Sequence, residues 1–402
     1  MNILIITPRM PFPPFRGDKL KIFNISKILA KTNKVKILTF IASEKEKDGI
    51  EEYKKLGIEI NTVFFPVWKS VLNCFFAVFS SEPFQIAWFR NSKMQKKINE
   101  ELSNTKIDLI YYHLIRSSQY LAKEKYPEVI HILDFTDAVS LYLNRLVESE
   151  NNIFKKWIFA IERNRIAKLE AVCEKFDSVY ICSESDKNFL LKKGICADIS
   201  LLENGIDNKQ FTSETYNPVP NRIIFTGNMP YFPNTDAAFF LAKEIFPIVL
   251  KNKPEAKLFL VGQNPSQRIM KLQSEKITVT GFVQDIKAEY LKSMVNVAPM
   301  RFGAGTLNKI IESLALGVPV VASSLSVSGM PKELKEFVFT ADNPEEYASK
   351  ICWIFENFEQ AKTHVNGAID TINKKLGWEV IVQQFESELL SKVNRKRNFA
   401  NK

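Results

Sequence analysis

Short apolar runs alternate with amphipathic stretches along almost the whole chain, and few folds accommodate this alternation. Strands that are buried on both faces of a parallel sheet appear in a sequence as continuous apolar runs, and parallel strands need crossover connections that are usually helical. The pattern therefore predicts an α/β fold with parallel sheets. The expected strands cover residues 3–6, 35–40, 58–65, 109–113, 129–134, 178–182, 199–202, 222–226, 257–261, 277–280, 295–299, 318–322 and 337–340.

A polar segment divides these strands into two series. Residues 204–221 read NGIDNKQFTSETYNPVPN, and the glycine and prolines of this segment are typical of a connection between domains. A chain of 402 residues is also too long for one ordinary core. We therefore predict one domain over residues 1–205 and a second over 206–376, with a helix at about 377–395 that returns to the first domain.

Several classes of site are excluded by missing motifs. The five cysteines and three histidines are scattered, so neither a disulfide framework nor a zinc site is predicted. The first expected strand is followed by TPRMPFPPFRGD, without the G-x-G-x-x-G of a dinucleotide site. The chain also has no P-loop motif and no Asp-x-Asp pair. We expect no metal and no cofactor beyond a substrate.

The charge of the chain points to an anionic partner. The formal net charge is +10 and the pI is near 9.1, which suits nucleic acid, an acidic lipid surface or phosphorylated substrates. No nucleic-acid-binding signature accompanies this charge, so nucleic acid is not expected. The opening MNILIITPR lacks the features of a signal peptide, and no apolar stretch approaches the roughly 20 residues of a membrane span. A cytoplasmic protein is therefore predicted.

A phosphate site is outlined by the stretch VNVAPMRFGAGTLNKIIESLALGVPVVAS at residues 295–323. It reads as strand, glycine-rich loop, helix and strand, with Gly303 and Gly305 in the loop and Thr306 where a helix would be capped. The first turn of a helix attracts anions through its free N–H groups. Lys309 and Glu312 share one face of the expected helix, so a cation and a hydroxyl acceptor lie together. An ordinary crossover helix with a flexible loop is the alternative.

Further segments match a known family. The opening strand with PPFRGDKLKIFNISKILA, the sequence ENGID at 203–207, FTGNMPYFPNTDA from Phe225, and FGAGTLNKIIESLALGVPVVAS from Phe302 are spread over most of the chain. Together they resemble a retaining glycosyltransferase of the GT-B type, family four, also described as glycosyl transferases group 1. EPFQIAWFRNSKM, YYHLIRSSQYL and ILDFTDAVSLY are similar to a subgroup associated with exopolysaccharide and cell-surface glycan assembly.

This resemblance implies two Rossmann-like domains that face a cleft, the first binding the acceptor and the second the donor. It implies a hexosyltransferase-like enzyme that moves a sugar from a nucleotide-sugar to a glycan or lipid-linked acceptor, with retention and without a metal. The donor-binding residues that it implies are Gly17, Asn228, Arg301, Gly303, Gly305, Thr306, Asn308, Lys309 and Glu312.

The chain departs from the family pattern at several of these positions. Family members carry a Glu-x7-Glu pair, and here the second glutamate is Glu312 whereas the first position is Ala304. Members also place Arg and Lys where this chain has Asn228 and Asn234. Neutralisation of a diphosphate is then expected from Arg301, Lys309 and the helix N-terminus, since hydrogen bonds between charged groups are about twice as strong as neutral ones.

Three residues of the first domain are candidates for the chemistry. Where many members carry a histidine after the fifth strand, this chain has Asp134, followed by Asp137. A carboxylate there could orient the sugar or stabilise positive charge at the anomeric carbon, or both could simply cap the next helix. His113 is a candidate acid or base, with a structural histidine as the alternative. Arg116 could bind a phosphate of the acceptor, or be a solvated surface residue.

An apolar and aromatic segment lies in the first domain. Residues 63–89 read VFFPVWKSVLNCFFAVFSSEPFQIAWF and carry few charges. With the basic balance of the chain, this composition suggests a surface that touches the anionic inner face of the cell membrane, where lipid-linked acceptors reside. A buried helix of the first domain is the other interpretation, and it is the favoured one.

Two alternative functions stay open beside the glycosyltransferase. One is another GT-B enzyme, such as a nucleotide-sugar epimerase, although the usual histidine and acidic pattern of an epimerase is not evident. The other is a catalytically degenerate protein that binds a glycan or nucleotide, which Ala304, Asn228 and Asn234 would suit.

Overall fold

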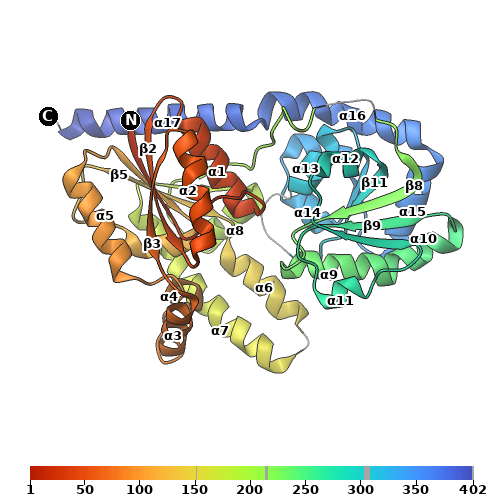
Figure 1. Ribbon diagram of the computed structural model, residues 1–402, viewed down its shortest axis with the longest axis horizontal. Helices are drawn as coiled ribbons and strands as arrows, with labels where there is room; N and C mark the ends of the chain where they lie inside the picture. The colour runs from red at the N-terminus through yellow and green to blue at the C-terminus, as the bar shows by residue number, and fades with distance from the viewer. Residues whose placement is uncertain (151, 213–215, 303–307, 401–402) are drawn as a thin grey trace. The chain divides into compact units, whose positions relative to one another are not determined.

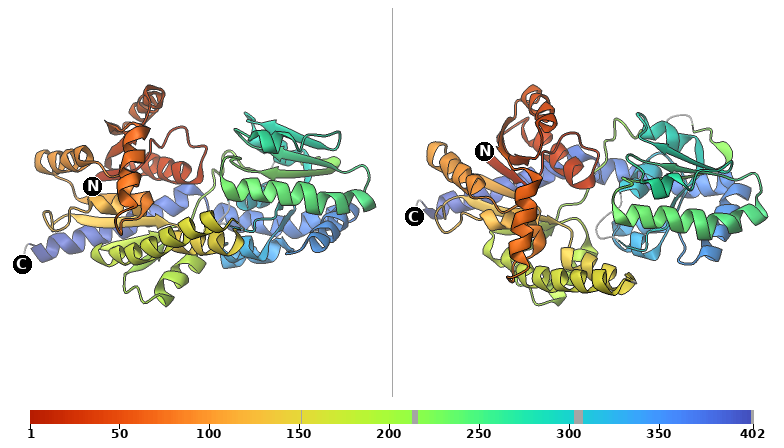
Figure 2. Two further views of the ribbon diagram at one scale, coloured as in Figure 1. Left: turned by 90° about the horizontal axis from the view of Figure 1, so that it is seen from below. Right: turned by 60° about the horizontal axis from the view of Figure 1, so that its bottom comes forward.

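The computed structural model describes residues 1–150, 152–212, 216–302 and 308–400 (Figure 1). The chain divides into two compact units, each built on its own parallel sheet. The first unit comprises residues 1–203 and 379–402, and the second comprises residues 204–378. Helices cover both faces of each sheet (Figures 1 and 2).

The first unit contains a seven-stranded sheet in the order β3-β2-β1-β4-β5-β6-β7. Its central strands are buried on both faces, and Ile5 of β1 pairs in register with Ile37 of β2 and Tyr111 of β4. Because the chain continues from β1 to one side and later returns to the other, the strand order reverses between β1 and β4. The strands are β1 (Asn2–Thr7), β2 (Lys34–Ile41), β3 (Glu59–Phe64), β4 (Leu109–His113), β5 (Ile130–Thr136), β6 (Ser178–Ile181) and β7 (Ile199–Leu201).

The helices of this unit follow its strands. The last of them, α17, packs on the sheet through Phe385, whose ring meets Tyr111 at 6.0 Å and Tyr180 at 4.9 Å edge to face. The α-helices are α1 (Gly17–Leu29), α2 (Asp48–Lys55), α3 (Val67–Ala77), α4 (Phe84–Ala87), α5 (Ser92–Asn104), α6 (Val139–Ser149), α7 (Ile153–Leu169), α8 (Glu184–Lys192) and α17 (Trp378–Ala400), and the short helical turns are η1 (Glu44–Lys47), η2 (Ile115–Tyr120) and η3 (Glu170–Lys175).

The second unit repeats this plan with a six-stranded sheet in the order β10-β9-β8-β11-β12-β13. The strand order reverses between β8 and β11, and the apolar side chains of these two strands lie at the centre of the core. The strands are β8 (Val219–Thr226), β9 (Lys257–Val261), β10 (Ile277–Gly281), β11 (Ser293–Ala298), β12 (Val320–Ala322) and β13 (Phe339–Thr340). The helical elements are α9 (Phe232–Phe240), η4 (Leu241–Ile245), α10 (Phe246–Asn252), α11 (Gln267–Met270), α12 (Ile286–Leu291), α13 (Asn308–Ala315), α14 (Ser324–Ser328), η5 (Lys332–Phe337), α15 (Pro344–Glu356) and α16 (Phe358–Lys375).

The predicted fold class is confirmed. Every expected strand is present, with its ends shifted by no more than a few residues, in two parallel sheets joined by helical crossovers. Buried apolar runs bounded by polar loops identify parallel strands well, because both faces of such strands are covered.

The favoured interpretation of the apolar segment 63–89, a buried helix, is wrong for its central part. Helix α3 buries only Ser70 and Ala77, whereas its large apolar side chains are exposed. The flanking residues Phe65 and Phe89 do enter the core of the first unit. No helix in the described part of the chain is both long enough and apolar enough to cross a membrane.

Candidate functional site

In the second unit, polar side chains gather where the strand order reverses. Strands β8 and β11 are neighbours, and Thr226, Asn228 and Arg301 lie at or just beyond the ends of these strands, while helix α13 begins at Asn308. Ligands of open parallel sheets bind at the carboxyl ends of the strands at such a reversal. Residues 303–307, which include the predicted Gly303, Gly305 and Thr306 and also Ala304, lie outside the described residues.

The ammonium group of Lys309 is held by an amide in place of a carboxylate. Its Nζ donates to Asn234 Oδ1 at 2.8 Å and lies 4.3 Å from the centre of the Phe225 ring. The amide nitrogen of Asn234 in turn donates to the Asn228 carbonyl at 3.0 Å. Gly227 allows this close packing, since a Cβ there would lie 2.7 Å from Asn234 Cγ. The two asparagines that replace the basic residues of the family therefore position Lys309.

The carboxyl group of Glu312 lies one helical turn further along the same helix. Its Oε2 accepts a hydrogen bond from the Tyr290 hydroxyl at 3.2 Å, and that hydroxyl is also 2.7 Å from Thr226 Oγ1. The carbonyl of Lys309 accepts from Tyr290 and from Asn296 Nδ2, at 3.3 and 3.0 Å. The start of helix α13 is thus fixed to the ends of strands β8 and β11.

Burial perturbs both ionisable groups. It lowers the pKa of Lys309 to about 7, a shift that the charge of Glu312 opposes. Burial also raises the pKa of Glu312 to about 7, against the hydrogen bond from Tyr290 and the charge of Lys309. Among the described residues, Lys309 has no carboxylate hydrogen-bond partner. An arriving anion would therefore stabilise its charged form, which burial has made unfavourable.

Arg301 is differently placed. Its guanidinium group forms a two-point pair with Asp236, with distances of 2.9 Å from Nε and 2.6 Å from Nη2, and it stacks 4.7 Å from the Phe240 ring centre. Arg301 therefore already has a counter-ion, whereas Lys309 is bound to a neutral amide. Asn308, the remaining predicted donor residue, is the first residue of α13 and is half-buried.

In the first unit, the predicted His113 ends strand β4 beside the last residue of β1. Its Nδ1 lies 3.0 Å from Thr7 Oγ1, and its Nε2 is buried without a hydrogen-bond partner among the described residues. Burial lowers the pKa of His113 to about 4, so the imidazole is neutral at physiological pH. A neutral ring with one unoccupied nitrogen can accept or donate a hydrogen bond to a ligand that enters here.

Asp134 lies in a different environment. The side chains of Asp134 and Lys21 are both fully buried, and Lys21 Nζ lies 3.0 Å from Asp134 Oδ1. Oδ1 also accepts from the Thr136 amide at 2.9 Å, and the Tyr111 hydroxyl donates to Oδ2. Burial alone would lower the pKa of Lys21, but the charge of Asp134 and its hydrogen bond raise it. Both oxygens of Asp134 are therefore engaged within the protein.

Asp137 is half-buried, and burial followed by the charge of Asp186 raises its pKa to about 7. It can therefore exchange a proton near neutral pH. The alternative in which these aspartates cap the next helix is wrong, because α6 is capped by Ala138 without a side-chain bond. Glu170 instead binds the Ser140 amide of that helix at 2.9 Å.

Gly17 begins helix α1, and a Cβ added there would meet nothing within 4 Å. The neighbouring carboxylate Asp18 is paired with Arg9 and Arg16, each at 3.2 Å. Arg116, which follows β4, donates from Nε and Nη2 to Gln85 Oε1 at 3.1 and 2.6 Å. It is half-buried, so the alternative of a solvated surface arginine is wrong.

These arginines carry more positive charge than their surroundings neutralise. Burial, followed by repulsion from Arg9, lowers the pKa of Arg116 to about 10. Burial would raise the pKa of Asp18, but the charges of Arg16 and Arg9 lower it below its usual range. The carboxyl ends of β1 and β4 therefore present a surface suited to an anion.

Sequence reasoning missed the residues that hold the predicted ones in place. Tyr290, Asn296 and Asp236 in the second unit and Lys21 in the first have structural roles at the sites. Asn296 had a detectable signal, since it is a polar residue within a buried apolar run. Among the described residues, no group of three or more His, Cys, Asp or Glu side chains is arranged to hold a metal ion.

Comparison with known proteins finds a family model that matches most of the second unit. Residues 220–357 match the family model described as Glycosyl transferases group 1. This stretch runs from strand β8 to just beyond helix α15, and it contains Lys309, Glu312 and the residues that position them.

Whole-chain relatives extend the likeness to both units. A curated relative, an uncharacterized 44.6 kDa protein in the cps region of Klebsiella pneumoniae, is 21% identical over 90% of this chain and 92% of its own. The crystal structure of Anabaena Alr3699/HepE in complex with UDP is 15% identical, covers 97% of this chain and 100% of that chain, and gives a TM-score of 0.69. Sucrose-phosphate synthase from Thermosynechococcus elongatus is 16% identical over 100% of both chains, with a TM-score of 0.74. Residues 220–357 therefore match the family of glycosyl transferases group 1, and the chain as a whole has the GT-B fold of these solved glycosyltransferase structures.

Proposed function

We propose that this enzyme transfers a sugar from a nucleotide-sugar to a glycan or lipid-linked acceptor in the synthesis of a cell-surface polysaccharide. The transfer retains the anomeric configuration and needs no metal ion. The observation that carries the proposal is that buried Lys309 and half-buried Glu312 share one face at the start of helix α13, in the region that matches the family.

In this proposal the donor binds to the second unit. Lys309 exchanges part of its contact with Asn234 for a phosphate oxygen, and Glu312 accepts hydrogen bonds from the ribose hydroxyls. Asn308 at the start of helix α13 contributes a free N–H group, which favours an anion; the predicted donor residues Gly303, Gly305 and Thr306 lie outside the described residues. Arg301 stays paired with Asp236, and its remaining guanidinium N–H groups can donate to a phosphate oxygen. The complex of HepE with UDP supports a uridine nucleotide as the first donor to test.

The acceptor binds to the first unit near Gly17 and His113. The arginines around Asp18 favour an acceptor that carries phosphate, as lipid-linked glycans do. Asp137, with its pKa near 7, is the group suited to exchange a proton with an acceptor hydroxyl. Asp134 acts as a positioning residue, since its oxygens are occupied by Lys21 and Tyr111. The cps-region relative supports a role in surface polysaccharide synthesis.

The stereochemistry of the product tests the reaction type. The donor is a nucleotide-sugar of known anomeric configuration. Nuclear magnetic resonance should show that the sugar initially released or transferred has the same configuration. The rate of transfer should be unchanged by EDTA. Inversion would contradict the retaining mechanism, and loss of activity in EDTA that added metal restores would contradict metal independence. Interconversion of free nucleotide-sugars would identify an epimerase instead.

We expect the substitution Gly17→Ala to reduce transfer on the order of tenfold or more without lowering the melting temperature. The structure leaves room for the new Cβ, and alanine favours a helix over glycine, so the protein itself has no reason to lose stability. Any loss of rate would then come from a clash with bound substrate. Steady-state transfer and thermal unfolding of the variant check this, and normal transfer would remove Gly17 from the site.

Donor affinity should fall as the pH rises above about 7. Lys309 has a pKa of about 7 in the free protein, and a bound diphosphate would favour its charged form, so binding takes up a proton above that pH. The limit is a tenfold loss of affinity per pH unit. Titration calorimetry in buffers from pH 6 to 9 measures the slope, which Lys309→Gln should flatten.

The contribution of Lys309 to the folding stability of the unliganded protein should rise with pH, in contrast to donor affinity. The pKa of Lys309 is lower in the folded state than the ordinary value of 10.5, so its cost to stability is fully present below about pH 7. That cost disappears as the pH rises toward 10.5, and the contribution of Lys309 to folding stability therefore improves over this window.

For donor affinity, a steeper loss with rising pH in the Lys309→Gln variant than in the natural protein would contradict the assignment of Lys309 to the donor site.

A further inference from the structure

Helix α3 has its apolar and polar faces reversed relative to an ordinary surface helix. The residues that face the protein are small or polar: Ser70 and Ala77 are buried, and Asn73 and Cys74 are half-buried. The large apolar side chains point outward. Trp68, Phe75 and Phe76 are 61%, 57% and 57% exposed, and Phe79 beyond the helix is 78% exposed. Exposed apolar groups of this size mark an interaction surface.

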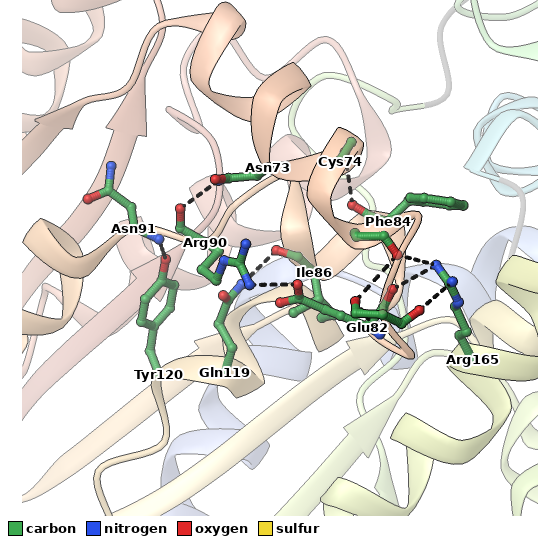
Figure 3. A network of polar contacts seen from close by, with 12 residues as sticks. Asn73, Cys74, Glu82, Phe84, Ile86, Arg90, Asn91, Gln119, Tyr120 and Arg165 are labelled. Carbon is green, nitrogen blue, oxygen red and sulfur yellow. Dashed lines mark hydrogen bonds and ion pairs between the residues drawn. The ribbon is translucent and has the colours of Figure 1, made fainter.

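The start of helix α7 has the same character. Ile153, Phe154 and Trp157 are at least 60% exposed. In Figure 1, α3 and α7 both lie at the lower edge of the first unit. Figure 3 shows the C-terminal half of α7 bonded through Arg165 to the segment that follows α3, whereas Ile153, Phe154 and Trp157 lie at the other end of α7. We name the exposed apolar side chains of α3, Phe79 and the first turns of α7 the apolar face.

The charged residues within the two exposed apolar segments have one sign. Residues 63–79 contain Lys69 and no acidic residue, and residues 152–161 contain Lys155 and Lys156 and no acidic residue. All three lysines are exposed, and the ammonium group of Lys69 lies 5.4 Å from the centre of the Trp68 ring. Apolar and aromatic side chains mixed with lysines are the composition of surfaces that enter the headgroup region of anionic bilayers.

Polar contacts hold the apolar face in a fixed conformation. The Nη1 of Arg165 donates to the carbonyls of Ala77 and Glu82, each at 3.0 Å, while Asn73 Nδ2 donates to the Arg90 carbonyl at 2.9 Å (Figure 3). Glu162 accepts from the amide of Phe84 at 2.8 Å. These hydrogen bonds thus fix the backbone that carries the exposed large side chains.

The same framework reaches the candidate acceptor site. The backbone N–H of Gln85 in helix α4 donates to Glu162 of α7 at 3.0 Å. The side-chain oxygen of Gln85 accepts from Arg116. Gln119 Nε2 donates to the Ile86 carbonyl at 3.2 Å (Figure 3). A group that docks on the apolar face is therefore connected to the carboxyl end of β4 by a short series of hydrogen bonds within one unit.

We propose that the apolar face docks this enzyme onto an anionic lipid bilayer, with the aromatic side chains of α3 and α7 in the headgroup region and Lys69, Lys155 and Lys156 against the lipid phosphates. The inference rests on the proposed function, because a lipid-linked acceptor would be met at the bilayer. A second copy of this chain is a poorer occupant, since a symmetric contact would bring lysines of like charge together in a protein of net charge +10.

Vesicle flotation of the full chain tests the proposal. Vesicles of phosphatidylcholine with phosphatidylglycerol should bind the protein at least tenfold more strongly than phosphatidylcholine alone. The double substitution Phe76→Ser with Phe79→Ser should weaken this binding at least tenfold, whereas Leu191→Ser, at a 41% exposed leucine of α8 in the same unit, should not. Lys155→Gln with Lys156→Gln should weaken binding to anionic vesicles, whereas Lys96→Gln on α5 should leave it unchanged.

Absence of binding to anionic vesicles, or equal binding to both vesicle types, would overturn the proposal. A dimer in light scattering that the Phe76→Ser, Phe79→Ser variant dissolves would also overturn it, in favour of a second copy. The shift in melting temperature caused by a nucleotide-sugar is measured on the same variants. If that shift persists while vesicle binding is lost, bilayer docking and donor binding are separate properties. A failure of the docking proposal can then be distinguished from a failure of the proposed function.

Discussion

Replacing Lys309 or Glu312 with alanine should abolish most sugar transfer while the fold stays intact. Lys309 is the buried cation on helix α13, close to Phe225 near the end of strand β8, and Glu312 on the same helix face is the acceptor held by Tyr290. Loss of one preorganised electrostatic contact to a developing charge reduces turnover on the order of 100-fold or more. Steady-state transfer measures the effect, and circular dichroism with thermal unfolding reports whether the fold is retained.

Matched substitutions separate chemistry from packing. Lys309→Met and Glu312→Gln keep most of the side-chain volume, so they should lose transfer to a similar extent without opening a cavity. Lys251→Ala and Glu255→Ala, at exposed positions of the same unit, should retain normal rates. Wild-type rates in both Lys309→Ala and Glu312→Ala would remove the donor site from helix α13.

The substitution Asp134→Asn should destabilise the protein by about 3–5 kcal/mol, because it leaves the fully buried ammonium group of Lys21 without its counter-charge. Chemical denaturation of the single variant measures the change in the free energy of unfolding. A direct catalytic role for Asp134 would instead predict a large loss of transfer with little change in stability.

The double substitution Lys21→Met with Asp134→Leu provides the control. Replacing both members of a buried ion pair with apolar residues is often neutral, so the double variant should recover much of the stability that Asp134→Asn loses. The Tyr111 hydroxyl would still lose its acceptor, which sets a limit on that recovery. If the double variant is less stable than Asp134→Asn, the pair is not the source of the effect.

The sheets were predictable because their signal is local. Strands such as residues 109–113 and 257–261 are continuous apolar runs between polar loops, and the structure places both with the predicted bounds. The fold class follows from the alternation of such runs with helices. The placement of Lys309 and Glu312 on one helix face was equally local, since helical periodicity fixes it.

The contacts that define the sites were not predictable in this way. Asp134 is neutralised by Lys21, which is 113 positions away in the chain, and Glu312 is held by Tyr290 from a different helix. No spacing in the sequence connects these pairs. The prediction that helix α3 is buried was wrong for a related reason, because the apolar content of a helix does not reveal which of its faces meets the protein. The residue roles assigned to Asp137, His113 and Gly17 stay predictions.

A thermal-shift screen with nucleotide-sugars tests the central claim most directly. The purified protein is measured with UDP-, GDP-, ADP- and CMP-sugars, with and without EDTA, and the screen is repeated on Glu312→Ala. We expect one nucleotide class to stabilise the natural protein by about 2.7 kcal/mol at a hundred times its dissociation constant, with no change in EDTA and no shift in the variant. Absence of a shift with every nucleotide-sugar would contradict a donor site and indicate a degenerate binding protein.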